Sequence, residues 1–193
     1  MILYIMNEFV QALRAIYPLS DASIDILLSH AEVVSMKKGE LVITEHQGGK
    51  YAYFIVKGLA RGYVIQKGKD STLWFASIGM TLLSMNAYLF TREGYENIEL
   101  LEDAELLRIP VALLNHLFET NLELCNWGRR MADHIIHRME LHFMRRNFMS
   151  AAERYHFFVA DEPELLRKVP LRHIASYLGI SQVSLSRIRA GIQ

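Results

Sequence analysis

Cysteine is nearly absent from this sequence of 193 residues, because Cys125 is its only example. One cysteine cannot form a disulfide within the chain, and it cannot supply the several thiolates that hold an iron–sulfur cluster or a structural zinc ion. Cys125 lies inside a helical pattern, which favours a small core or interface residue. We therefore expect no disulfide framework and no bound metal.

Long apolar runs are also missing, and no stretch approaches the roughly 18 residues that cross a bilayer. The opening segment MILYIM is apolar but short. It has neither a basic start nor a small-residue cleavage site, so we do not interpret it as a signal peptide. Apolar residues make up 51% of the chain and charged residues 22%, as in ordinary globular proteins. We expect a cytoplasmic protein with no membrane partner.

Acidic residues are missing from the last part of the chain. Residues 165–193 contain five bases and no acid, whereas residues 1–164 carry all 21 acids and 16 bases. The net charge of zero therefore hides an acidic body and a basic tail. This split indicates a nucleic-acid partner, although a solvated cationic helix end has the same composition. The five bases are Arg167, Lys168, Arg172, Arg187 and Arg189.

Residues 32–109 have the pattern of a small antiparallel sandwich or barrel. Short β-rich runs such as YAYFIVKG and STLWFASIG alternate with glycine turns, at the spacing of roughly 8–12 residues that is typical of such folds. Gly58 and Gly68 are expected at hairpin turns. Residues 7–30 are predicted to be helical, with Ser20 as an N-cap within them.

A long helix is predicted over residues 121–146, with Asn121 as its cap. Its apolar positions recur at steps of three and four, close to a heptad seam. Such a seam could pack on the β domain of its own chain or pair with a second copy, and the expected length of roughly 37 Å favours the homodimer. Gly128 is expected to let the partner backbone approach. The predicted interface residues are Leu124, Trp127, Met131, Ile135, Met139 and His142.

The segment HIASYLGISQVSLSRIR, residues 173–189, holds two short helical patterns around a glycine. Gly179 is expected to end the first helix, which Pro170 opens, and Ser181 to cap the second. This spacing predicts a helix-turn-helix, whose second helix places short polar groups at base edges and arginines near phosphates or a guanine. An ordinary helical hairpin has the same spacing. The predicted DNA-binding residues are Arg172, Ser181, Gln182, Val183, Ser184, Ser186, Arg187 and Arg189.

The stretch IASYLGISQVSLSRIR resembles the helix-turn-helix of the Crp/Fnr superfamily of bacterial transcription regulators, in which an IA-x-x-LG helix leads into a recognition helix ending in SR. YFIVKGLARGY is similar to the glycine hairpin of the family's cyclic-nucleotide-binding-like β-roll, and ELLEDAELLRIP is similar to its closing strands. The chain is most similar to short regulators of the Bacteroidetes type.

The resemblance implies an α+β fold in three parts: an antiparallel β-roll (a double-stranded jelly roll) with flanking helices over residues 1–120, a dimerisation helix over 121–147, and a helix-turn-helix domain over 148–193. It implies a homodimeric transcription regulator that binds double-stranded DNA. RNA polymerase and an unidentified small-molecule effector are the further partners that it implies. An effector in the β-roll would set the spacing of two recognition helices at about 34 Å.

Departures from the family pattern argue against a cyclic nucleotide. Members that bind cyclic AMP have a Gly-Glu pair for the ribose, and an Arg followed by Ser or Thr and Ala for the cyclic phosphate. Here Met80 follows Gly79, and residues 94–97 contain no arginine, although Arg92 is close. Without a cation a phosphate gains no charge-assisted hydrogen bonds, so we do not expect cyclic AMP or cyclic GMP. The eight histidines leave haem open, although surface or core histidines are the simpler explanation.

Two departures concern DNA. The family often has Glu where this chain has Val183, and a valine can meet a thymine methyl but cannot accept a hydrogen bond from cytosine. The target site is therefore expected to differ from the common one. The family also places a β-hairpin wing after this helix, and the four residues that follow Arg189 cannot form a full one. We expect weaker or more salt-sensitive binding as a result.

The effector cavity is expected within the β-roll, although most of its candidate residues could equally fill a closed core. These candidates are Tyr63, Trp74, Phe75, Gly79, Met80 and Tyr95. One alternative function is a ligand-binding or protein-interaction module of the same fold that has lost specific DNA binding. Another is an enzyme with a cupin-like metal site, but the β region offers only His46, with Glu40 and Glu45 nearby. We do not expect an enzyme.

Overall fold

The computed structural model describes residues 2–46 and 49–191, which form two compact units. Unit 1 comprises residues 1–62 and 75–133, and unit 2 comprises residues 63–74 and 134–193, within those limits. The sequence predicted boundaries at residues 121 and 148. The compact units instead divide the long helix between them and assign the tip of one hairpin to unit 2. The separate dimerisation part stays a prediction.

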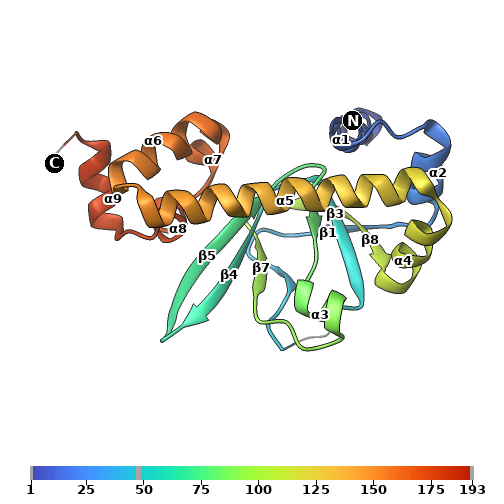
Figure 1. The fold of residues 1–193 in the computed structure, drawn as a ribbon, viewed down its shortest axis with the longest axis horizontal. Helices are drawn as coiled ribbons and strands as arrows, with labels where there is room; N and C mark the ends of the chain where they lie inside the picture. The colour runs from blue at the N-terminus through green and yellow to red at the C-terminus, as the bar shows by residue number, and fades with distance from the viewer. Residues whose placement is uncertain (1, 47–48, 192–193) are drawn as a thin grey trace. The chain divides into compact units, whose positions relative to one another are not determined.

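Two four-stranded sheets form the β-roll, with the strand orders β1-β8-β3-β6 and β2-β7-β4-β5 (Figure 1). The pairs β1–β8, β2–β7, β3–β6 and β3–β8 are antiparallel. The predicted antiparallel β-roll within an α+β fold is therefore confirmed. The strands are β1 (Glu32–Met36), β2 (Leu41–Ile43), β3 (Tyr51–Lys57), β4 (Ala60–Gln66), β5 (Lys69–Ala76), β6 (Thr81–Leu82), β7 (Asn97–Leu100) and β8 (Ala104–Pro110).

The two central strands of the first sheet are buried on both faces. Phe54 and Leu107 pack on the core under the helices, while Ile55 and Leu106 are buried on the opposite face. A strand that is covered on both sides reads as a nearly continuous apolar run, which is how YAYFIVKG and AELLRI appear in the sequence. This sheet is therefore a layer inside unit 1.

Helices of unit 1 cover one face of this sheet, and their local sequence explains where they begin. Ser20 caps α2, because its hydroxyl accepts a hydrogen bond from the Ser23 amide at 3.3 Å. Asn121 caps α5 in the same way, through the Leu124 amide at 3.0 Å. Both predicted caps are confirmed. The helices of this unit are α1 (Ile2–Ile16), α2 (Asp21–Ser29), α3 (Met85–Phe90), α4 (Val111–Thr120) and the first part of α5 (Leu122–Phe148).

Unit 2 contains the second part of α5, four short helices and the hairpin tip. Its helices are α6 (Ala151–Asp161), α7 (Pro163–Lys168), α8 (Leu171–Leu178) and α9 (Gln182–Arg189), coloured orange to red in Figure 1. A capping box starts α6, since Ser150 accepts from the Glu153 amide and Glu153 accepts from the Ser150 amide. Pro163 occupies the first turn of α7.

Gly58 and Gly68 were both expected at hairpin turns, and both have positive φ. The hairpin at Gly68 is present, but Gly58 connects β3 of the first sheet to β4 of the second, so the hairpin expected there is wrong. The hairpin between β4 and β5 turns at Lys67 and Gly68, which both have positive φ as a two-residue loop requires. The expectation about a wing concerns residues 190–193, the last two of which lie outside the described part of the chain.

Candidate nucleic-acid interface

The helix-turn-helix predicted at residues 170–189 is formed by α8 and α9. Gly179 ends α8 with a φ of 69°, a left-handed conformation that a residue with a Cβ adopts only with strain. Ser181 begins α9 by accepting a hydrogen bond from the Ser184 amide at 3.0 Å. The pair is held together by a small apolar core of Ile174, Ala175, Leu178, Leu185 and other side chains, all of which are buried.

Two isoleucines of this motif, Ile180 in the turn and Ile188 near the end of α9, are half-buried. Leu185 is the fully buried residue of α9. Ser184 and Ile188 are partly covered, and the other side chains of α9 are exposed to a partner or to solvent.

One face of α9 is exposed and carries most of the predicted DNA-binding residues. Ser184 is half-buried instead, and its hydroxyl lies 2.8 Å from the Ser181 hydroxyl, so these two groups serve the cap. The exposed residues are Gln182, Val183, Ser186, Arg187 and Arg189.

Arg172 lies on α8 and is exposed. Its Nε donates a hydrogen bond to Nε2 of the buried His173 at 3.3 Å. This bond engages Nε of the guanidinium, and a DNA contact by Arg172 stays a prediction.

Arginines of neighbouring helices brace the turn. Arg154 donates from Nε to the Leu178 carbonyl at 3.0 Å and from Nη1 to the Met149 carbonyl at 2.7 Å. The Arg146 guanidinium packs so closely on Gly179 that a Cβ there would lie 3.1 Å from its central carbon. The turn therefore favours glycine for its left-handed conformation, whereas the flexible end of the Arg146 side chain could shift to admit a Cβ.

The hairpin tip of β4 and β5 contacts α8, which sequence patterns did not predict. The Ser176 hydroxyl accepts a hydrogen bond from the Thr72 amide at 2.9 Å and donates one to the Asp70 carbonyl at 3.2 Å. An Asp70 carboxylate oxygen also lies 3.9 Å from Nδ1 of His173. Since β5 is the edge strand of its sheet, one serine satisfies polar groups that an edge strand leaves open. A contact between residues about a hundred positions apart leaves no local signal.

Half of the predicted dimer seam lies inside the protomer. Leu124, Trp127 and Met131 are buried in the core of unit 1, where Trp127 lies on Phe54 and donates from Nε1 to the Leu13 carbonyl at 3.1 Å. A second chain cannot reach these side chains, so this part of the prediction is corrected. The periodicity was real, but its partner is the protein's own core.

The other three residues of the predicted seam differ in their surroundings. Ile135 and Met139 are exposed. His142 instead stacks on Tyr177 of α8, with ring centroids 4.4 Å apart. Burial, and then the positive charges of Arg146, Arg145 and Arg154, lower the pKa of His142. His142 therefore packs within unit 2.

One further interpretation of α5 is corrected. Gly128 faces Phe118 of α4, whose ring would lie 3.0 Å from a Cβ at this position, so the glycine admits a neighbouring helix of the same unit and not a partner backbone. Cys125 is exposed, so of the two predicted alternatives the core position is wrong and the interface position stays a prediction. Gly128 thus correctly indicated that another part of the structure packs closely against α5, but the sequence did not indicate that this part is α4.

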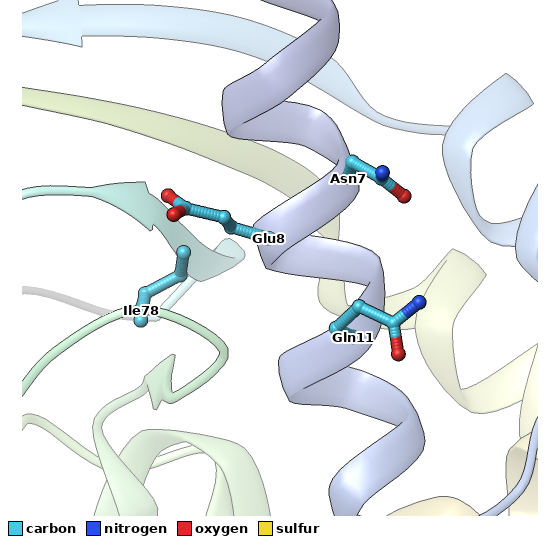
Figure 2. Close-up of a pocket in the computed structure, with 4 residues that line it drawn as sticks. All are labelled: Asn7, Glu8, Gln11 and Ile78. Atoms are coloured by element: carbon cyan, nitrogen blue, oxygen red, sulfur yellow. The ribbon is translucent and has the colours of Figure 1, made fainter.

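The six candidates for the effector cavity are divided between the two units. Tyr63 and Trp74 belong to unit 2, and the other four belong to unit 1. Phe75 is buried, Tyr95 is exposed, and Gly79 lies so close to Ala12 of α1 that a Cβ would meet its methyl group at 2.6 Å. A shallow hollow of unit 1 is lined by Asn7, Glu8, Gln11 and Ile78, with the first three on α1 (Figure 2). The sequence did not single out these four, and the effector site stays a prediction.

The described residues contain no group of three or more histidine, cysteine or carboxylate side chains placed to bind a metal ion. His46 lies 3.3 Å from a carboxylate oxygen of Glu93, and both are exposed. None of the helices within residues 2–46 and 49–191 combines the length and the apolar character needed to cross a bilayer.

The fold is that of the Crp/Fnr transcription regulators, as the comparison with solved structures shows. FixK2 from Bradyrhizobium japonicum has a TM-score of 0.72 at 19% identity, covering 83% of each chain. The c-di-GMP-responsive global regulator CLP of Xanthomonas campestris has 0.71 at 16%, covering 89% of this chain and 91% of CLP. The catabolite activator protein of Thermus thermophilus has 0.58 at 19%, covering 93% and 85%. No family model and no curated protein matches the sequence.

Proposed function

We propose that the chain is a DNA-binding transcription regulator that acts as a homodimer. The observation that carries this proposal is the exposed face of α9, which presents Arg187 and Arg189 beside Gln182 and Ser186 on a segment without a single acid. An acid-free face on the second helix of a helix-turn-helix suits the phosphate-lined major groove. The likeness of the fold to transcription regulators supports the same conclusion.

The dimer that we propose uses a stripe of α5 different from the seam predicted by sequence. Ile136, Met139 and Phe143 are 62–65% exposed and recur at steps of three and four, so they lie on one side of the helix. Apolar side chains that are this exposed on one helix side indicate a helical partner. A second copy of the same stripe supplies that partner with two-fold symmetry. The dimer would then present two recognition helices to half-sites about 34 Å apart.

The β-roll is proposed to respond to an effector other than a cyclic nucleotide. Two arginines lie on strands of the roll. Arg61 is almost fully buried, and its guanidinium lies 2.8 Å from a Glu99 oxygen; Arg108 lies 2.9 Å from a Glu32 oxygen. Arg92 is exposed and stands over the Phe90 ring. The two strand arginines are therefore each paired with a carboxylate, and Arg92 is on the surface. Recruitment of RNA polymerase belongs to the same proposal.

The test is DNA affinity measured by fluorescence anisotropy on full-length protein across a salt series, with Arg187→Ala as the variant. We expect the wild type to bind duplex DNA, with an affinity that falls steeply as salt rises. Arg187→Ala is expected to weaken binding by about 1–3 kcal/mol if the arginine contacts a base, or to lower the salt slope by about one if it contacts a phosphate.

The matched control is Arg92→Ala, which removes an exposed arginine from unit 1 and should leave affinity and salt slope unchanged. Equal affinity of wild type and Arg187→Ala would contradict the proposal. It would favour a module of this fold that does not use its helix-turn-helix for DNA.

A further inference from the structure

The outermost line of α9 consists of Val183 and Arg187. Leu185 is the buried residue of the helix, and at 3.6 residues per turn the positions two before and two after it lie on the opposite side. Val183 is 63% exposed, and Arg187 is exposed beside it. Gln182 and Ser186 flank this line and are also exposed. These residues would meet the base edges first.

The other predicted contacts are directed elsewhere. Ser184 is engaged with Ser181, at 2.8 Å between the two hydroxyls. Arg189 is the last residue of α9 and lies only about 40° from the buried Leu185 around the helix, whereas Gln182, at about 60°, is at the N-terminal end, where a recognition helix contacts base edges. Arg172 donates through its Nε to His173. Arg189 and Arg172 therefore suit phosphates. Base reading is left to Gln182, Val183, Ser186 and Arg187, and because a serine hydroxyl does not discriminate strongly among bases, the preference comes from the other three.

The chemistry of these three side chains specifies which bases they fit. A glutamine amide pairs in a bidentate manner with N6 and N7 of adenine, and an apolar side chain packs on the thymine methyl. A guanidinium pairs with O6 and N7 of guanine. Cytosine is best recognised by a carboxylate that accepts from its N4, and residues 165–193 contain no carboxylate side chain.

We propose that α9 reads a half-site in which Gln182 binds an adenine, Val183 packs on the methyl group of a thymine in the neighbouring base pair, and Arg187 binds a guanine. This inference rests on the proposed function and adds the base preference of the same surface. Four residues of helix separate Val183 from Arg187 by about 6 Å. This distance is close to two base-pair steps of roughly 3.4 Å each, so the thymine and the guanine lie about two pairs apart.

The experiment is selection of binding sites from a randomised duplex library with full-length wild type, Val183→Glu and Val33→Glu. Val33 is the matched control, because it is a valine of unit 1 that is 64% exposed. The wild type and Val33→Glu are expected to select the same A·T-containing half-site. Val183→Glu is expected to replace the thymine with a cytosine at that position and to leave the guanine unchanged.

A second measurement removes single groups from the selected site. Replacing the contacted thymine with deoxyuridine deletes one methyl group, and we expect wild-type affinity to fall by about fourfold. The Val183→Glu protein should show no such loss. Gln182→Ala is expected to reduce the preference for adenine over guanine at its position by at least fivefold.

The possible outcomes distinguish a failure of the base preference from a failure of the proposed function. A wild-type site with a G·C pair at both positions, or an identical site for wild type and Val183→Glu, would overturn the base preference and leave DNA binding intact. Absence of any DNA binding at low salt would overturn the proposed function and this inference together. Selection of adenine, thymine and guanine in this arrangement, with loss of the thymine alone in Val183→Glu, would support both.

Discussion

The two parts of α5 carry the same apolar period but use it differently. In the first part Leu124, Trp127 and Met131 are buried in unit 1, whereas in the second part Ile136 and Met139 are exposed. The second part makes polar contacts within unit 2 instead, including ion pairs from Arg138 to Glu162 and from Arg145 to Asp161. A heptad period thus shows that a helix has a partner along one side, but it does not say which partner.

Shortening a side chain should lower stability most in the first part of α5. Trp127→Ala is expected to lower the free energy of unfolding of unit 1 by about 3–5 kcal/mol, because it leaves a large cavity against Phe54 and removes the hydrogen bond to the Leu13 carbonyl. Urea denaturation followed by circular dichroism measures the loss. Phe148→Ala is the control, since Phe148 is 74% exposed, and it should change stability by less than about 0.5 kcal/mol. Similar losses for the two variants would remove the contrast between the two parts of the helix.

The second part of α5 should tolerate a shortened side chain but not a charged side chain within the proposed dimer interface. Met139→Glu places a carboxylate in the proposed interface, next to its copy in the second chain. We expect the dimer dissociation constant to rise by about a hundredfold, or about 3 kcal/mol, as measured by sedimentation velocity over a range of concentrations. Met144→Glu makes the same change more than a quarter turn around the helix and should leave association unaltered. A wild type that stays monomeric at high concentration would refute the interface.

The smallest effect concerns His142, whose pKa is lowered by burial against Tyr177 and by the arginines around it. The unfolded chain then binds a proton more readily than the folded one. The stability that neutral His142 provides is therefore complete above pH about 6.5, and it decreases as the pH falls below that value. One proton limits the slope to about 1.4 kcal/mol per pH unit.

His142→Gln should flatten this pH dependence in thermal melts between pH 5 and pH 8, whereas the same change at the exposed His156 should not. An unchanged profile in His142→Gln would show that other groups of unit 2 cause the dependence. The first part of α5 contains no histidine, so within this helix the pH dependence distinguishes the second part from the first.

Much of the fold was predictable because its signals are local. Gly68, Ser181 and Gly179 each determine the structure of their immediate neighbours, and all three lie in the predicted turn or cap. The alternation of β-rich runs and turns likewise predicted an antiparallel β-roll, although it did not predict which strands pair, since β1 pairs with β8 and β2 with β7.

The predictions that were wrong concerned contacts between residues far apart in the sequence. Trp127 and Gly128 pack on Phe54 and Phe118, which the sequence does not place near them. Of the exposed stripe of α5, Met139 was predicted, but Ile136 and Phe143 were missed for the same reason, since only the fold shows which side of the helix is already covered. At the candidate site, the helix-turn-helix and its arginines were predicted from the sequence. Which side chains face the DNA bases and which serve the fold could be decided only from the geometry of α9.

The bond between Ser176 and the β5 edge has a consequence for the order of folding. Thr72 precedes Ser176 by 104 residues, so during synthesis at about 5–20 residues per second the hairpin waits roughly 5–20 seconds for its helix. Contacts of such long range are slow to form, because the chain between them must first be brought together. Unit 2 is therefore completed last, and a fragment starting at His134 lacks the strand that Ser176 binds.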